Sequence, residues 1–460
     1  MMMRMLGVCK QLRQGGATML SRFASSCAGE TQMTTLDNGL RIVTLTEPYS
    51  SPVASVGLFI DSGSIYEKPE EYGTTLILER LAFKSTQNRT SLQMTREIEG
   101  VGGFHTSSAS REHMSYIYFG LSCYLPHMLE LLVDTVRNPV YKESEVQKLK
   151  AEVFGASQNP DLLLVDLLHL AGYRGPLANH IVAPESSVEG LDAITVQQFV
   201  VENYTASRMV LVATGVDHEE LIRYAKPILS DLPSVSRPEE PPQSLYVGGD
   251  WRMEAYSQPT YVALGFEFRG GWLQLKDALT ITVMQMLMGG GGSLAVRGLE
   301  NGKYSQLGLR VVNEYPEIQS LSAFSSIYRN TGFFGIMAAA GPDFVPKIAD
   351  IAVGELTAVT NPLKIDLTQL KRAKQATKSA LLKNLDSRVV AVEYMGKQIL
   401  TYGERKPLRE ILDTIEAVTC QDIASVAKKL ISSPLTMASY GDVDRLQTYD
   451  SVCSKFCPPL

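Results

Sequence analysis

The chain contains the same pattern twice, at positions about half its length apart. The first copy reads AITVQQFVVENYTASRMVLVATGVDHEEL from Ala193, and the second reads AVTCQDIASVAKKLISSPLTMASYGDVDRL from Ala417. Each copy has a threonine, a predicted helix, an apolar strand and a Gly-Asp end, and the offset between the copies lies between 224 and 227 residues. Because solenoid repeats recur every ~20–50 residues, this spacing predicts a duplicated domain instead.

The duplication divides the chain into two predicted domains, residues 34–235 and residues 245–450. The linker predicted between them, residues 236–244, falls largely within the stretch SVSRPEEPPQ, which has three prolines and two glutamates. Proline has no N–H to donate, so this stretch cannot form a helix or a central strand. It predicts an extended connection that runs over the surface.

Each predicted domain mixes strands and helices. Apolar residues alternate over Leu40–Thr46 and Val53–Asp61, as in half-buried strands. Two further segments, Ser91–Gly100 and Tyr124–Arg137, are predicted to be helices, and in the second the apolar residues recur at helical spacing. The strands and helices do not alternate regularly, so the pattern favours an α+β fold over a doubly wound parallel sheet.

The N-terminal residues 1–29 have a composition of their own. They contain Arg4, Lys10, Arg13 and Arg22 and no acidic residue, and they are rich in serine and alanine. An arginine-bearing, acid-poor segment with an apolar helical face is typical of a mitochondrial transit peptide. The alternative is a disordered start with no targeting role.

Composition excludes several classes of function. The net charge of −6 and the pI of about 5.7 argue against nucleic acid as a partner, since nucleic-acid-binding domains are usually basic. No apolar stretch reaches the ~18 residues that a transmembrane helix needs. The six cysteines are scattered, which argues against a disulfide scaffold.

Residues 73–85, GTTLILERLAFKS, are where a hydrolytic site is expected. This helix and the strand before it resemble the pitrilysin family of inverted zincins, whose motif is H-x-x-E-H. On a helix, histidines at i and i+4 share a face and hold one zinc ion, and the glutamate activates a zinc-bound water. Leu76 and Arg80 occupy the two histidine positions, and only Glu79 remains. Leucine cannot ligate a metal, and the arginine cation repels one.

The third ligand of that family, a glutamate about eighty residues later, is also missing. Local matching puts Gly155 at its position, plain counting puts Ser157 there, and Glu152 is the nearest carboxylate. We therefore expect no metal and no catalytic residue in this chain, and a surface or ion-paired role for Glu79. The six histidines are too scattered to form another metal site.

Longer strings narrow the resemblance. They are LAFKSTQNRT at 81–90, SASREHMSY at 108–116, YTASRMVLVATGVDHEEL at 204–221, QMLMGGGGS at 285–293 and GKQILTYGERKP at 396–407. Together they resemble the alpha subunits of mitochondrial processing peptidases, most closely the plant forms, over about residues 34–450. The resemblance implies two homologous pitrilysin-like domains, each a mixed or antiparallel sheet packed with helices.

The resemblance also implies a role and its partners. Such an alpha subunit is not an enzyme by itself. It pairs with a catalytic beta subunit that carries the zinc, helps to bind presequences, and in plants serves as a core subunit of respiratory complex III on the matrix face of the inner membrane. The alternative is a purely structural core subunit of complex III without substrate handling.

The glycine run Gly289, Gly290, Gly291 and Gly292, with Ser293, is the candidate substrate-binding loop, and Lys303 is its candidate basic residue. Consecutive glycines cannot hold a helix, so their backbone groups are expected to be open to a passing peptide. A phosphate cradle would need a Lys-Ser/Thr pair after the glycines, and Leu294 and Ala295 follow instead. A plain flexible connector is the other alternative. The loop lacks the Phe and Pro of the family pattern, which favours the structural alternative.

Overall fold

The structure is a computed structural model of the chain. It describes residues 29–45, 52–147, 149, 159–181, 185–234, 243–255, 259–290, 311, 314–315, 317–341 and 343–456. The predicted transit peptide, apart from Gly29, and most of the predicted linker lie outside these residues. The domain boundaries therefore stay predictions. Within the described residues, no helix is both long enough and apolar enough to cross a membrane.

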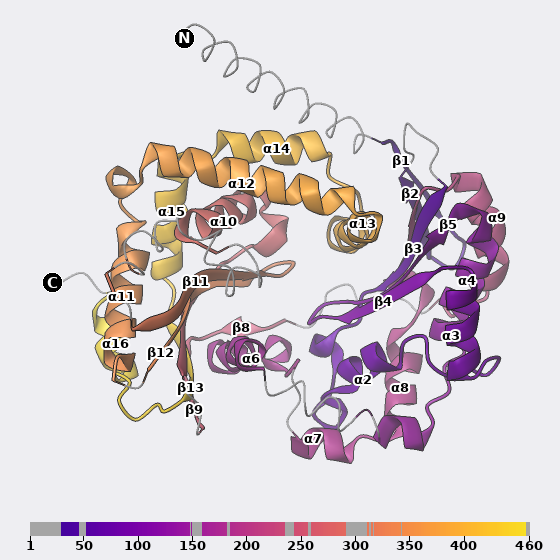
Figure 1. The fold of residues 1–460 in the computed structure, drawn as a ribbon, viewed down its shortest axis with the longest axis horizontal. Coiled ribbons are helices and arrows are strands. Elements are labelled where there is room, and N and C mark those ends of the chain that lie inside the picture. The colour runs from indigo at the N-terminus through magenta and orange to yellow at the C-terminus, as the bar shows by residue number, and fades with distance from the viewer. Residues whose placement is uncertain are drawn as a thin grey trace, which may run out of the picture.

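The first half is built around a six-stranded sheet (Figure 1). Its strand order is β1-β2-β7-β3-β5-β4, and only the β2–β7 pair is parallel. The strands are β1 Thr31–Thr35, β2 Arg41–Leu45, β3 Val53–Ile60, β4 Phe104–Ala109, β5 Met114–Leu121 and β7 Met209–Thr214.

The second half repeats this arrangement in a five-stranded sheet of order β11-β12-β10-β13-β9. Its strands are β9 Gly249–Glu254, β10 Thr260–Glu267, β11 Ile318–Ile327, β12 Gly332–Ala340 and β13 Thr436–Gly441. Again a single pair, β13–β9, is parallel. Strands β2, β7, β3, β5 and β4 thus correspond in order to β9, β13, β10, β12 and β11. This correspondence confirms the duplication and the α+β fold that the sequence predicts.

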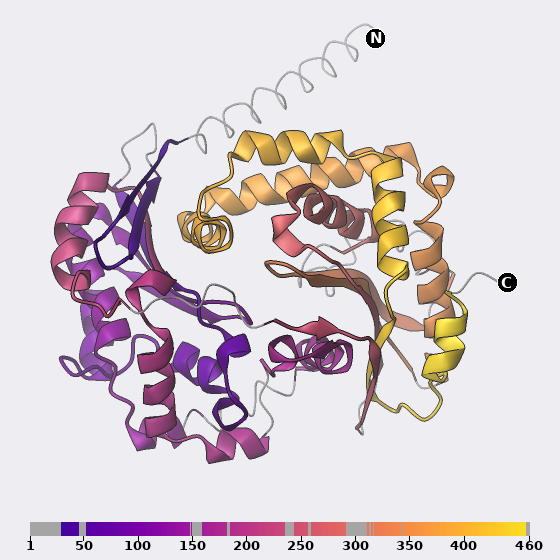
Figure 2. The same cartoon turned by 180° about the vertical axis from the view of Figure 1, so that it is seen from behind.

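Helices cover each sheet and bury its apolar face (Figure 2). The first half has α2 Thr74–Leu81, α3 Ser91–Gly100, α4 Leu125–Arg137, α7 Glu185–Gly190, α8 Ala193–Asn203 and α9 His218–Leu229. The second half has α10 Leu275–Met288, α11 Val345–Ala358, α12 Leu367–Asp386, α14 Leu408–Ala417, α15 Cys420–Ile431 and α16 Tyr449–Ser454. Two short strands, β6 Tyr173–Arg174 and β8 Leu245–Tyr246, pair with each other between the halves.

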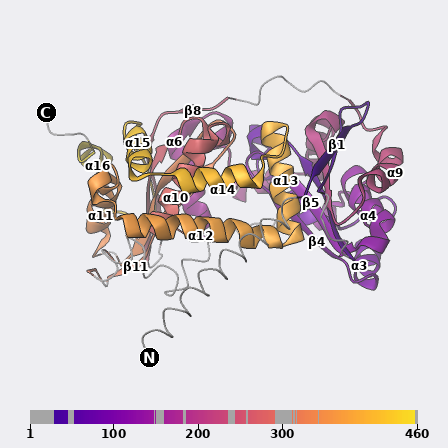
Figure 3. The same ribbon diagram turned by 90° about the horizontal axis from the view of Figure 1, so that it is seen from above.

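Helices α6 and α13 join the halves, because each packs on the sheet of the other half. Helix α6, Pro160–Gly172, lies against β13, β9 and β10, and α13, Arg388–Tyr402, lies against β3 and β7 (Figure 3). Val392, Met395 and Ile399 of α13 share a buried cluster with Phe59. Gly396 allows this close approach, since a Cβ there would lie 2.4 Å from the Phe59 ring.

Candidate functional site

The helix that carries the altered zinc motif, α2, is held at its N-terminus by a buried carboxylate. Glu67 accepts hydrogen bonds from the N–H of Gly73 at 3.0 Å and from the N–H and hydroxyl of Thr75, both at 2.7 Å. The two N–H groups lie at the start of the helix, where no helical carbonyl can accept their hydrogen bonds. Burial nevertheless raises the pKa of Glu67 to about 7, against the opposing effect of these hydrogen bonds.

The three motif positions lie on α2 beside β4. Leu76 packs against the core of the first half, Glu79 is half-buried, and Arg80 is exposed. Burial raises the pKa of Glu79, while the charge of Arg80 and the backbone N–H of Ala109 lower it. The surface or ion-paired role expected for Glu79 stays a prediction. The hydroxyl of Ser107 donates to the Glu79 carbonyl at 2.9 Å, which ties α2 to β4.

No metal centre is found around this helix in the described part of the chain. Within it, no group of three or more His, Cys, Asp or Glu side chains could hold a metal ion. The candidates for the third ligand position, residues 152, 155 and 157, lie outside the described residues. A leucine and an exposed arginine leave Glu79 with no metal-bound water to activate, so these side chains cannot perform the hydrolysis of a zinc peptidase.

The histidines have structural contacts instead. His218 bonds through its two ring nitrogens to the hydroxyls of Thr34 and Thr44, each at 2.8 Å. His169 bonds to the hydroxyl of Tyr328 at 2.6 Å. His105 stacks on Phe83 with ring centroids 4.4 Å apart. These contacts place the three histidines in the packing of the sheets.

The glycine loop begins where α10 ends. Gly289 has φ +104°, the left-handed conformation that ends many helices, and the N–H of Gly290 donates to the Gln285 carbonyl at 2.8 Å. A Cβ on Gly290 would lie 2.1 Å from the Ala323 carbonyl oxygen of β11. Gly289 therefore ends the helix and Gly290 packs on β11, and the N–H groups of both are bonded to carbonyls of α10 and not open as expected. Gly291, Gly292, Ser293 and Lys303 lie outside the described residues, so their binding role stays a prediction.

Sequence reasoning missed a set of buried charges where the halves meet. Arg111, in the turn between β4 and β5, donates to Asp166 of α6 at 2.7 Å, and both side chains are buried. In the same turn Glu112 accepts the backbone N–H of Arg329, from the corresponding turn between β11 and β12, at 2.9 Å. Asp166 stands inside the apolar run LLLVDLLHL, where a charge is rarely buried without a partner, and that signal could have found it.

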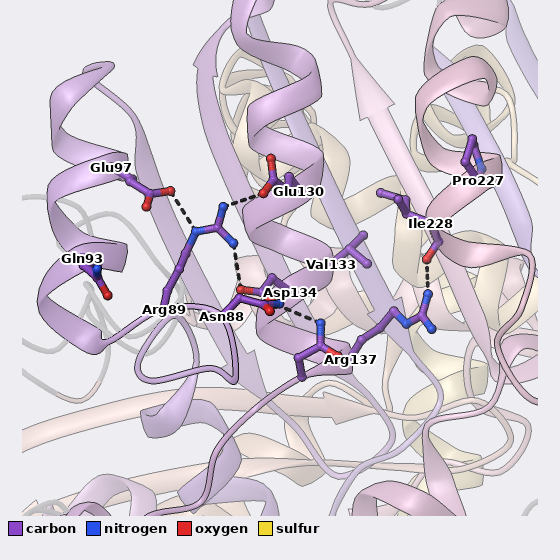
Figure 4. Close-up of a pocket in the computed structure, with 11 residues that line it drawn as sticks. Asn88, Arg89, Gln93, Glu97, Glu130, Val133, Asp134, Arg137, Pro227 and Ile228 are labelled. Atoms are coloured by element: carbon purple, nitrogen blue, oxygen red, sulfur yellow. Dashed lines mark hydrogen bonds and ion pairs between the residues drawn. The ribbon is translucent and has the colours of Figure 1, made fainter.

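A hollow lies on the outer side of the first half, between α3, α4 and α9 (Figure 4). Its volume is about 720 Å³. Arg89 there bonds to Glu97 at 2.8 Å, Glu130 at 2.5 Å and Asp134 at 3.0 Å. Arg89 thus fastens α3 to α4, and Arg137 of α4 donates to the Ile228 carbonyl of α9, so these contacts hold the three helices together.

Comparison with known proteins decides the family. The family model for insulinase (peptidase family M16) matches residues 41–185, and the model for the peptidase M16 inactive domain matches residues 191–377. The mitochondrial-processing peptidase subunit alpha of Solanum tuberosum is 54% identical over 431 residues, which are 93% of this chain and 85% of that protein. The chain belongs to the family of mitochondrial-processing peptidase alpha subunits.

Further relatives agree with this alpha-subunit assignment. The probable mitochondrial-processing peptidase subunit alpha-1 of Arabidopsis thaliana is 49% identical over 92% of this chain and 84% of its own length. The probable beta subunit of the same plant is 31% identical over 92% of this chain and 80% of its own length. A solved structure described as complex III2 from Candida albicans, Inz-5 bound, has a TM-score of 0.77 and 20% identity, over 92% of this chain and 99% of that one, which shows the fold.

Proposed function

We propose that this alpha subunit is the non-catalytic, presequence-recognising partner of a zinc-bearing beta subunit in the mitochondrion. The observation that carries the proposal is the motif helix of a peptidase fold with Leu76 and Arg80 where ligands are needed, in a chain of the alpha-subunit family. A chain of this kind contributes to proteolysis by holding the substrate, while the metal acts from the other subunit.

The beta subunit is the proposed partner because it would supply the zinc that this chain lacks. The plant beta relative is similar over nearly the whole chain, so the two subunits are expected to share the two-sheet architecture. We place the zinc in the beta subunit and none in this chain. We place the heterodimer in the matrix and on the matrix face of the inner membrane, where it would contact other subunits of respiratory complex III.

A second function has its own support. In the purely structural alternative, the chain is a core subunit of complex III that no longer handles presequences. The loop text SLAVRGLENGKYSQL favours it, because Arg297 and Glu300 make the segment more charged than a plain glycine loop. The resemblance of the fold to a chain of a complex III structure is compatible with both functions.

Crosslinking separates the two functions. A presequence peptide with a photoreactive group is bound to the heterodimer of this chain with a zinc-depleted beta subunit, and the crosslinked chain is identified by mass spectrometry. We expect crosslinks in residues 291–303, and we expect unlabelled presequence to remove them. Crosslinks confined to the beta subunit would support the structural function instead.

The matched control replaces residues 293–302 by glycine and serine at the same length. This variant keeps Gly289, which ends α10, and Gly290, which packs on β11, so the helix is not disturbed. Loss of crosslinking in this variant would assign recognition to the side chains of the loop. Unchanged crosslinking would assign it to the loop backbone.

A further inference from the structure

The second sheet ends in a strand whose outer side is not paired. Strands β2 and β9 are equivalent, since each pairs in parallel with the last strand of its half along the chain, β7 or β13. In the first half, β1 pairs with the free side of β2. In the second half, β9 is the last strand of the sheet, and no strand of the described residues takes the place of β1 (Figure 1).

The backbone of β9 is therefore available on that side. The N–H of Gly249 donates to the Leu435 carbonyl at 3.0 Å, and the N–H of Ala255 donates to the Gly441 carbonyl at 3.1 Å. Because backbone groups alternate along a strand, the N–H and C=O groups of Asp250, Arg252 and Glu254 face away from β13. An edge of this kind is a template on which another strand can pair.

Large apolar side chains lie beside this edge. Trp251 is 45% exposed and Met253 is 41% exposed, and both point to the same face of the sheet. Met253 is in register with Tyr440, and Tyr440 with Tyr261, so an apolar row crosses three strands on this face. Tryptophan, tyrosine and methionine are enriched in protein interfaces, where they supply much of the binding energy.

The charges around the edge select a cationic partner. Glu254 is exposed, and Asp442, which follows its register partner Gly441, is exposed beside it. The basic residue of β9, Arg252, is already bonded to Asp250 at 2.8 Å and to the Gln447 carbonyl at 2.7 Å. The edge thus has two exposed acidic side chains, while the arginine of β9 is already bonded. Opposite charges across an interface favour association, so a cationic partner is favoured.

We propose that β9 is a docking edge for an extended, positively charged polypeptide segment. The segment would pair with β9 as a sixth strand of this sheet and place alternate apolar side chains on Trp251 and Met253. Its basic side chains would lie near Glu254 and Asp442. This surface is separate from Gly289 and Gly290 and from α2, and it does not depend on the presequence role proposed above.

Binding of a designed peptide tests the proposal. A fluorescent peptide of about twelve residues that alternates lysine and valine is titrated with the full chain, alone and in the heterodimer with the beta subunit. We expect saturable binding that weakens with salt. The same peptide with glutamate in place of lysine is expected to bind at least about tenfold more weakly.

Three variants locate the site. Trp251→Ser removes the apolar anchor, Glu254→Gln removes one charge, and Glu254→Pro also removes an N–H that faces the open side. We expect Trp251→Ser and Glu254→Pro each to weaken binding at least about tenfold, and Glu254→Gln to weaken it less. The control is Met33→Ser on β1, whose side chain is 47% exposed, and it should bind like the wild type. Far-ultraviolet circular dichroism checks that each variant is folded.

Several results would overturn the proposal. They are the absence of saturable binding, equal binding of the glutamate peptide, and wild-type binding by both Trp251→Ser and Glu254→Pro. Binding to the free chain that disappears in the heterodimer would also overturn it, because the beta subunit would then be what covers β9.

Discussion

The ion pair between Arg111 and Asp166 is predicted to hold the two halves together. Arg111 is 1% exposed and Asp166 is 2% exposed. Besides the arginine, Asp166 accepts the Ile181 N–H at 3.0 Å and bonds to His180 at 2.9 Å. Asp166→Asn keeps the shape of the side chain but leaves the Arg111 guanidinium buried without a counter-charge. Breaking a buried pair in this way costs about 3–5 kcal/mol of the free energy of unfolding.

The assay is urea unfolding followed by two signals. Both tryptophans, Trp251 and Trp272, are in the second half, so fluorescence reports on that half, whereas circular dichroism reports on the entire chain. Because Asp166 belongs to the helix that packs on the second sheet, Asp166→Asn should shift both transitions. The matched control is Arg409→Met in the exposed pair Arg409–Asp413, which should change stability by less than about 0.5 kcal/mol.

A double-mutant cycle completes this test. Arg111→Met should cost a similar amount, since it leaves the carboxylate of Asp166 buried. The variant with both changes should be more stable than the sum of the two costs predicts, by at least about 2 kcal/mol. Single costs below about 1 kcal/mol, or costs that simply add, would refute the role given to this pair.

Three further predictions concern the motif helix and the glycine loop. The pKa of Glu67 is raised from 4.5 to about 7 in the folded chain, so the free energy of unfolding should fall as pH rises from 4.5 to 7. Glu67→Gln should make this dependence on pH less steep by up to about 1.4 kcal/mol per pH unit. Urea titrations at several pH values measure it. Gly290→Ala should lower the free energy of unfolding by about 1–3 kcal/mol, because the added methyl meets the β11 backbone. Gly354→Ala, where nothing lies within 4 Å, should not destabilise the chain. Because Leu76 and Arg80 replace ligands, a chelator should leave the melting temperature of the isolated chain unchanged.

Elements with a clear local period could be predicted from the sequence. Helix α3 has the predicted bounds Ser91–Gly100. Strand β7, Met209–Thr214, lies where the first copy predicts an apolar strand. The two copies also predict the same order of helix and strand at the end of each half, as observed. In these segments the apolar pattern and the turn residues depend only on near neighbours in the chain.

The exchange of α6 and α13 could not be predicted in the same way. The apolar sequence of α6 predicts that this helix is buried, but it does not predict which sheet the helix packs on. The pairing of Arg111 with Asp166, which lie 55 residues apart in the chain, has the same origin, since it arises only when α6 meets the turn of β4 and β5. Tertiary packing decides such contacts.

In the candidate site, too, some features could be predicted from the sequence and others depend on tertiary packing. Residue identity alone shows that positions 76 and 80 cannot ligate zinc. The hydrogen bond from the Ser107 hydroxyl to the Glu79 carbonyl, in contrast, depends on how α2 meets β4. Four consecutive glycines predicted open backbone groups. In the structure Gly289 ends α10 and Gly290 packs on β11, because a helix end must satisfy its last carbonyls.

Presequence cleavage by the reconstituted heterodimer tests the central claim most directly. Cleavage is compared for the beta subunit alone, for its mixture with this chain, and for a mixture in which residues 291–303 are shortened behind Gly290. We predict cleavage by the complete mixture, little by beta alone, and loss of cleavage with the shortened loop although the heterodimer still forms. A heterodimer that assembles but never cleaves, or that cleaves equally well without the loop, would contradict the account.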